Sequence, residues 1–122
     1  MLGVASGDRP EEYLALNCPF ADHGDRFRDS FDYIECMWET APAFENAYGS
    51  PHGRMDMLPK PTSGKLPLLM TGGSQQDPDW IARHGDGWIT YPRGVAAQAS
   101  IINDWRARVE AVGEPVKPAV QS

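Results

Sequence analysis

The chain contains little cysteine, no long apolar run and no excess of positive charge. Its two cysteines, Cys18 and Cys36, are too few for a disulfide framework and lack metal-ligand spacing, so we expect reduced thiols and no metal site. Eleven basic against seventeen acidic side chains give a net charge of −6, which argues against a nucleic-acid partner because no basic face could neutralise phosphates. The longest apolar runs are about five residues, well below the ~20 that cross a bilayer, so we expect no membrane span.

The N-terminus also lacks the basic start and apolar core of a signal peptide. What is present is typical of a folded domain: 41% of the residues are hydrophobic, with four Trp, four Tyr and four Phe. The sequence therefore predicts a globular cytoplasmic protein.

Apolar segments alternate with segments of helical periodicity along the chain. We predict strands over residues 2–5, 67–71, 87–91 and 116–121. The first helical stretch, from Gly24, repeats Phe27, Phe31, Ile34 and Trp38 on one face. Further helices are expected between Pro78 and Gly85, with Asp77 as N-cap and Gly85 at C′, and between Val95 and Gly113. This alternation predicts an α/β fold with a parallel sheet and helices on one face.

Residues 42–65 interrupt this rhythm. They combine several prolines with Gly49, Gly53 and Gly64, and we interpret them as a long loop excursion within a single domain spanning residues 1–122. Three βα units and a terminal strand cannot close a (β/α)8 barrel, which takes ~250 residues. The sequence thus predicts a partial TIM barrel, about half of a complete one.

The loop after the second predicted strand is the clearest candidate site. It reads Gly72-Gly73-Ser74-Gln75-Gln76-Asp77 and leads into a helix opened by Pro78. Free backbone N–H groups and the helix dipole at such a turn favour a phosphate. The Ser74 hydroxyl could donate to that phosphate or could bond its own loop as an ordinary turn serine. Gln75 and Gln76 could add donors or be solvated.

Five segments in order carry a family likeness: GVASGDRP at 3–10, GDRFRDSFDYIECMW at 24–38, LPKP at 58–61, TGGSQQDPDWIARHGDGWITYPR at 71–93, and the following IINDWRARVE. This combination resembles the luciferase-like oxidoreductases, flavin-dependent TIM barrels typified by bacterial luciferase. The resemblance covers essentially the whole chain and corresponds to the middle of the family's barrel, from its fourth strand to its seventh.

The resemblance implies an FMN-binding oxidoreductase or monooxygenase, with a deazaflavin as the alternative cofactor. It places the cofactor phosphate at Gly72, Gly73, Ser74, Gln75 and Gln76. It also places the bend formed by Ala5, Ser6 and Gly7, together with the strand end at Tyr91 and Arg93, beside the flavin. Arg93 could instead be a surface residue. Trp88 is most simply a core residue, with stacking on the flavin as the alternative. No residue is assigned to catalysis.

Two functions remain open at this point. The chain is either a luciferase-like flavoenzyme acting on an unknown small organic substrate, or a non-catalytic α/β module that keeps a phosphate-binding turn. The family's first three strands and its last strand have no counterpart in this sequence. We therefore expect the isolated chain to be inactive. We also expect it to form a homo-oligomer or to associate with the missing barrel half.

Overall fold

The structure is a computed structural model that describes all residues, 1–122, and the chain divides into two compact units. The sheet unit comprises Met1–Ala5 and Pro67–Ser122, and the helical unit comprises Ser6–Leu66. None of the helices in either unit is both long enough and apolar enough to span a bilayer.

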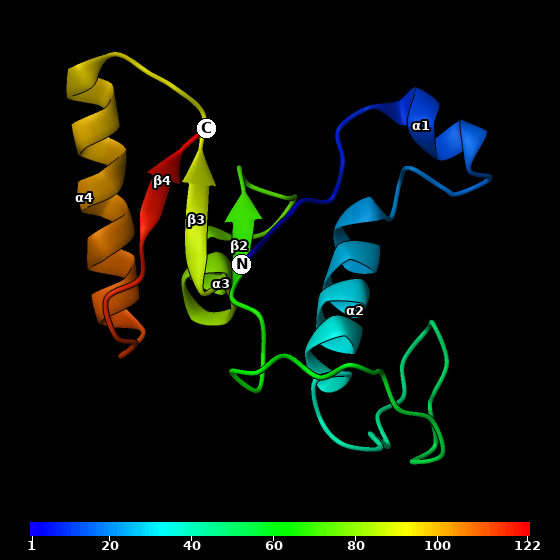
Figure 1. Cartoon of the computed structure of the whole chain (residues 1–122). Coiled ribbons are helices and arrows are strands. Elements are labelled where there is room, and N and C mark those ends of the chain that lie inside the picture. The colour runs from blue at the N-terminus through cyan, green and yellow to red at the C-terminus, as the bar shows by residue number, and fades with distance from the viewer. The chain divides into compact units, whose positions relative to one another are not determined.

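The sheet unit contains four parallel strands whose spatial order follows the chain (Figure 1). The strands are β1 Leu2–Val4, β2 Leu68–Thr71, β3 Gly87–Thr90 and β4 Ala119–Gln121. Helix α3, Pro78–His84, connects β2 to β3, and helix α4, Val95–Ala111, connects β3 to β4. Every neighbouring pair is parallel, so the predicted α/β class and the parallel strand order are confirmed.

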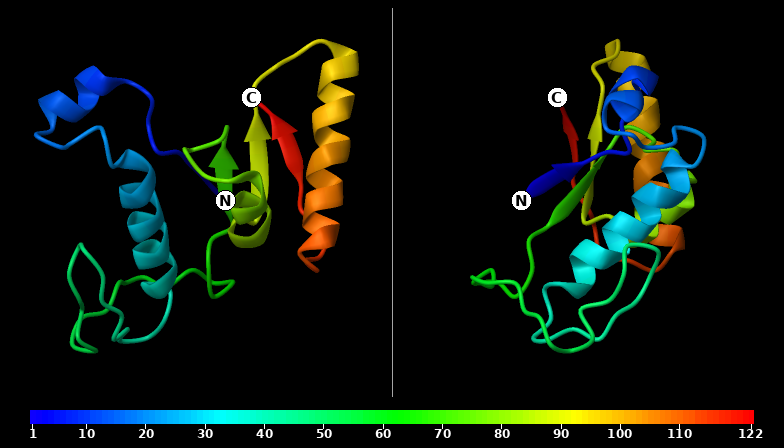
Figure 2. Two further views of the ribbon diagram at one scale, coloured as in Figure 1. Left: turned by 180° about the vertical axis from the view of Figure 1, so that it is seen from behind. Right: turned by 90° about the vertical axis from the view of Figure 1, so that its right-hand side faces the viewer.

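The core of this unit lies between the sheet and its two helices. Figure 2 shows α3 and α4 on the same face of the sheet, as the sequence predicts. Successive strand residues point to opposite faces of the sheet. Met70 is fully buried and lies on the helix-covered face, where it contacts Gly85 at the end of α3. Burial of these apolar side chains holds the helices on the strands. The buried hydrophobic residues of this layer are Leu68, Met70, Ile81, Ala82, Trp105 and Val109, and Leu69 is buried on the opposite face of the sheet.

Two local expectations differ from the structure. Strand β4 begins at Ala119 rather than at residue 116, because Pro118 has no N–H to donate to a ladder. Gly85 follows α3 with an extended backbone, φ −73° and ψ 143°, and not in the left-handed C′ conformation. A side chain there would meet Met70 and the Ile81 carbonyl at 3.0 and 3.1 Å, so glycine is required for space.

The helical unit contains α1, Pro10–Ala15, and α2, His23–Cys36. The predicted apolar face of α2 is confirmed at Phe27 and Phe31, which are buried. Helix α2 ends two residues before Trp38. Helix α1 was not predicted, because it has six residues and buries none of them.

Residues 42–65 form no helix or strand, apart from one isolated bridge between Asn46 and Gly49. Side chains fasten them to the polypeptide around α2: the Asn46 amide donates to the Asp29 carbonyl at 2.7 Å. The Lys60 ammonium donates to the carbonyls of Met37 and Glu39 at 3.0 and 2.6 Å. The excursion is therefore an ordered part of the helical unit.

Candidate phosphate-binding loop

The loop after β2 has an unusual backbone. Gly72, Ser74 and Gln75 adopt left-handed conformations with φ of 59°, 46° and 57°. Two of these three are non-glycine residues, for which this conformation is uncommon and typical of turns and binding sites. The backbone N–H groups of Gly73, Ser74 and Gln75 donate to no other group of the chain. The loop thus presents three consecutive free backbone donors.

Strand β3 fixes the start of this loop at Gly72. The Gly72 N–H donates to the Ile89 carbonyl at 2.9 Å, and the Trp88 indole N–H donates to the Gly72 carbonyl at 2.8 Å. The Tyr91 ring lies against the Gly72 α-carbon so closely that a side chain at position 72 would meet the ring at 3.1 Å. Glycine is required at position 72 both for this contact and for its positive φ.

Ser74 is buried, and its hydroxyl donates to the Thr71 carbonyl at 2.9 Å. The Gln76 amide donates to the Ser74 carbonyl at 3.1 Å, and the Gln76 N–H donates to the Gly73 carbonyl at 2.8 Å. In this arrangement Ser74 behaves as the turn serine of the simpler alternative. Its side chain shapes the loop, and its backbone N–H is the group left free.

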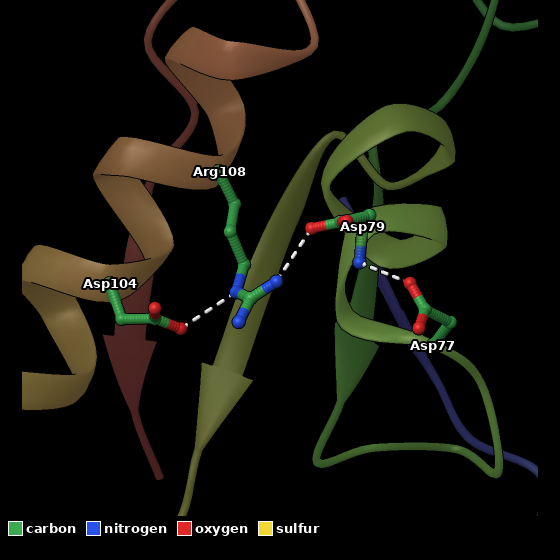
Figure 3. A network of polar contacts seen from close by, with 4 residues as sticks. All are labelled: Asp77, Asp79, Asp104 and Arg108. Carbon is green, nitrogen blue, oxygen red and sulfur yellow. Dashed lines mark hydrogen bonds and ion pairs between the residues drawn. The ribbon is translucent and has the colours of Figure 1, made fainter.

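The acidic side chains after the loop are all engaged (Figure 3). The Asp77 carboxylate accepts from the Asp79 N–H at 2.8 Å, which confirms Asp77 as the N-cap of α3. Arg108 of α4 donates to Asp79 at 2.6 Å and to Asp104 at 2.7 Å. These two hydrogen bonds, that of Asp104 first, raise the pKa of the Arg108 guanidinium above its ordinary value. The carboxylates near the loop are therefore capped or ion-paired.

A cavity of about 120 Å³ lies beneath the loop, on the side of the sheet covered by the helices. Its apolar wall includes the Trp88 and Trp105 rings, whose centroids are 5.5 Å apart. The volume is well below the ~300 Å³ at which ligand pockets begin, so the cavity is too small for a flavin ring. Its lining residues are Gly72, Gly73, Gln76, Pro78, Ile81, Trp88, Asp104, Trp105 and Arg108.

The structure brings together some of the residues that the family likeness assigns to the cofactor. Residues 72–76 form one loop with Tyr91 packed on it, and Ala5 follows β1 at the same carboxyl edge of the sheet. Arg93 instead lines a second cavity, of about 360 Å³, with α4 and Gln121.

Ser6 and Gly7 belong to the helical unit, where both contact Tyr13. The Tyr13 hydroxyl donates to the Ser6 carbonyl, and its ring lies under Gly7, which has φ of 79°. Tyr13 thus shapes the bend that the sequence predicts at residues 5–7.

Sequence reasoning missed two groups near the loop. The pairing of Asp104 with Arg108 could have been found, because charges four residues apart face each other on a helix. The Trp88 indole bond to Gly72 has no local signal, since it joins residues sixteen apart through the folded sheet.

The side chains suited to metals or redox chemistry do not gather in the chain. No group of three or more His, Cys, Asp or Glu lies together in a way that could hold a metal ion. Both cysteines are free. Burial, followed by the negative charge of Glu39, raises the pKa of the Cys36 thiol and keeps it protonated at neutral pH.

A parallel sheet with helices on its face and a glycine-rich loop at the carboxyl ends of its strands places the chain among the α/β proteins, whose ligand sites lie at that edge. Within that class, the family model of luciferase-like monooxygenases matches residues 1–122, and the chain belongs to this family. The four-stranded parallel sheet is consistent with a part of the family's TIM barrel.

Two relatives show how much of a family member the chain represents. An uncharacterised protein of Mycobacterium tuberculosis is 28% identical over 95 residues, which cover 77% of this chain and 34% of that protein. The FMNH2-dependent dimethylsulfone monooxygenase of Pseudomonas putida is 26% identical over 125 residues, covering 99% of this chain and 34% of that enzyme. The chain spans about a third of the length of the curated relatives it matches.

Proposed function

We propose that this chain is the cofactor-phosphate portion of a flavin-dependent monooxygenase and that it binds the FMN phosphate on residues 72–77. Membership of the luciferase-like family supports the reaction class. The observation that carries the phosphate assignment is the run of three free backbone donors at Gly73, Ser74 and Gln75. A phosphate accepts several hydrogen bonds at once, and charge-assisted bonds of this kind are the strong ones.

Three features of the loop favour a bound phosphate: free donors, balanced charge and open space. The free N–H donors have no competing carboxylate beside them, because the Asp77 carboxylate accepts from the Asp79 N–H. Arg108 offsets the charges of Asp79 and Asp104 nearby. Gly73 is open, since a side-chain carbon built on it would have no atom within 4 Å, so an anion can approach the backbone closely.

The bound flavin would supply the redox chemistry, while the protein binds and orients it. We rest the proposal on the loop donors rather than on the dipole of α3, because that helix has only seven residues. The Ser74 hydroxyl holds the turn through the Thr71 carbonyl, and the Tyr91 ring covers Gly72. Both contacts fix the loop that carries the three free N–H groups.

FMN is preferred to a deazaflavin because the related Pseudomonas putida enzyme is named as FMNH2-dependent. Both cofactors carry a phosphate, so the loop suits either. Competition between FMN and a deazaflavin for the same chain measures the preference directly.

The proposal is tested by titrating the 122-residue chain with FMN and following flavin fluorescence. Gly73→Ala adds a methyl group where a phosphate would approach, so we expect a loss of FMN affinity of at least about tenfold, or ~1.4 kcal/mol. The folded chain has room for that methyl, and the free energy of unfolding should stay within about 0.5 kcal/mol of wild type.

Gly94→Ala is the matched control. Gly94 is equally open, with no atom within 4 Å of a built side-chain carbon, but it precedes α4. FMN affinity should be unchanged in this variant. Equal affinity of wild type and Gly73→Ala, or no saturable FMN binding by the wild-type chain, would overturn the proposal.

A further inference from the structure

The Trp88 side chain makes a contact that core packing alone does not require. Its ring packs beside Trp105 in the cavity beneath the loop. Its indole N–H donates a hydrogen bond to the Gly72 carbonyl at 2.8 Å. The next residue of β3, Ile89, accepts the Gly72 N–H at 2.9 Å. Both polar groups of Gly72 are therefore held by consecutive residues of one strand.

The Gly72 carbonyl belongs to the same planar peptide unit as the Gly73 N–H. In a trans peptide the C=O and N–H point in opposite directions, so an indole that fixes the carbonyl also fixes the direction of that N–H. Glycines on both sides of this peptide leave it free to rotate in the absence of such a bond. A hydrogen bond accepted at the carbonyl also polarises the peptide and strengthens its N–H as a donor.

The Gly73 N–H is the first of the three free donors of the loop. We infer that Trp88 is a positioning residue for the cofactor phosphate: its indole N–H, acting through the Gly72 carbonyl, aims the Gly73 N–H at the phosphate. This inference rests on the proposed function. It assigns Trp88 a specific part in phosphate recognition, in place of flavin stacking, because the ring contacts Trp105 on the helix-covered side of the sheet.

Trp105 provides a matched comparison. It lines the same cavity, and its indole N–H also donates to a backbone carbonyl, that of Lys117, at 3.1 Å. That carbonyl lies outside the loop. Trp88→Phe and Trp105→Phe therefore remove equivalent groups from one cavity, and only the first removes a bond to the loop.

The experiment compares the dissociation constants of FMN and of riboflavin, which lacks the phosphate, for the two variants and the wild type. We expect Trp88→Phe to weaken FMN binding about five- to tenfold while leaving riboflavin binding unchanged. Trp105→Phe should leave the ratio of the two constants at the wild-type value. A general loss of structure would weaken both ligands together and would not change that ratio.

If Trp88→Phe does not fold, benzothienylalanine at position 88 keeps the size of the ring and removes only the N–H. A shift of the Gly73 amide resonance in this variant, with a lost preference for FMN over riboflavin, supports the inference. If a variant at position 88 keeps the wild-type preference for FMN over riboflavin, the inference is wrong. That result would not contradict the proposed function. A wild-type chain that binds FMN and riboflavin equally overturns both.

Discussion

The sheet unit and residues 42–65 of the helical unit are stabilised by different interactions. Four parallel strands in the sheet unit share backbone hydrogen bonds and bury a continuous set of apolar side chains against α3 and α4. Residues 42–65 of the helical unit have no such ladder, and polar side chains such as Asn46 and Lys60 fasten them to backbone carbonyls. The stability of the sheet unit should therefore depend on its buried apolar volume. The attachment of residues 42–65 should depend on a few charged or polar side chains.

The largest effect should come from the core of the sheet unit. Met70→Ala removes a fully buried side chain, and the resulting cavity should lower the free energy of unfolding by about 2–5 kcal/mol. Urea unfolding followed by circular dichroism measures it. Met55→Ala is the control, because Met55 in the helical unit is 65% exposed and its loss should change little. Similar values for both variants would contradict the comparison.

A smaller effect is expected in the helical unit from Lys60→Met. The substitution keeps the length of the side chain but removes the bonds to the Met37 and Glu39 carbonyls, and should cost about 1–3 kcal/mol. Amide hydrogen exchange should rise in residues 42–65 and stay unchanged in β2 and β3. Arg54→Met serves as the control, since the Arg54 side chain forms no ion pair or hydrogen bond, and exchange unaltered by Lys60→Met would refute the assignment.

The smallest effect should be an acid sensitivity of the helical unit. A hydrogen bond from the Lys60 ammonium lowers the pKa of Asp56 below its ordinary value of 3.8. A lowered folded-state pKa stabilises the fold at pH above the ordinary value, and this contribution is lost as the pH falls below it. Hydrogen exchange of residues 42–65, normalised to an unstructured peptide at each pH, should therefore rise below about pH 4. Asp56→Asn should remove that dependence, and an unaltered profile in this variant would exclude Asp56 as its source.

The sheet was predictable because its strands are short apolar runs bounded by glycine and proline. Leu68 to Met70 form a continuous buried run, which is typical of a parallel strand. Helix α1 was not predictable in the same way. Its apolar residue Leu14 is 80% exposed, so no buried face gives the six residues a hydrophobic period.

The loop that carries the proposed site was predictable in position, and its contacts were less so. Two glycines and a serine after a buried strand indicate a turn, and the turn is there. The left-handed conformations of Ser74 and Gln75 run against the preferences of those residue types, so residue preferences alone did not predict them. The Arg108–Asp79 ion pair joins residues 29 positions apart and has no local pattern. Its formation depends on the packing of α3 against α4.

The arrangement of the tryptophans has an optical consequence. Three of the four, including Trp88 and Trp105, lie in the sheet unit, and Trp38 is alone in the helical unit. The paired rings are 5.5 Å apart and inclined by 34°, so their electronic transitions couple in a fixed, chiral geometry. Such a pair gives a circular dichroism couplet that an isolated indole does not. The sheet unit therefore has a spectroscopic signature of its own, and light can report on its folding without an attached label.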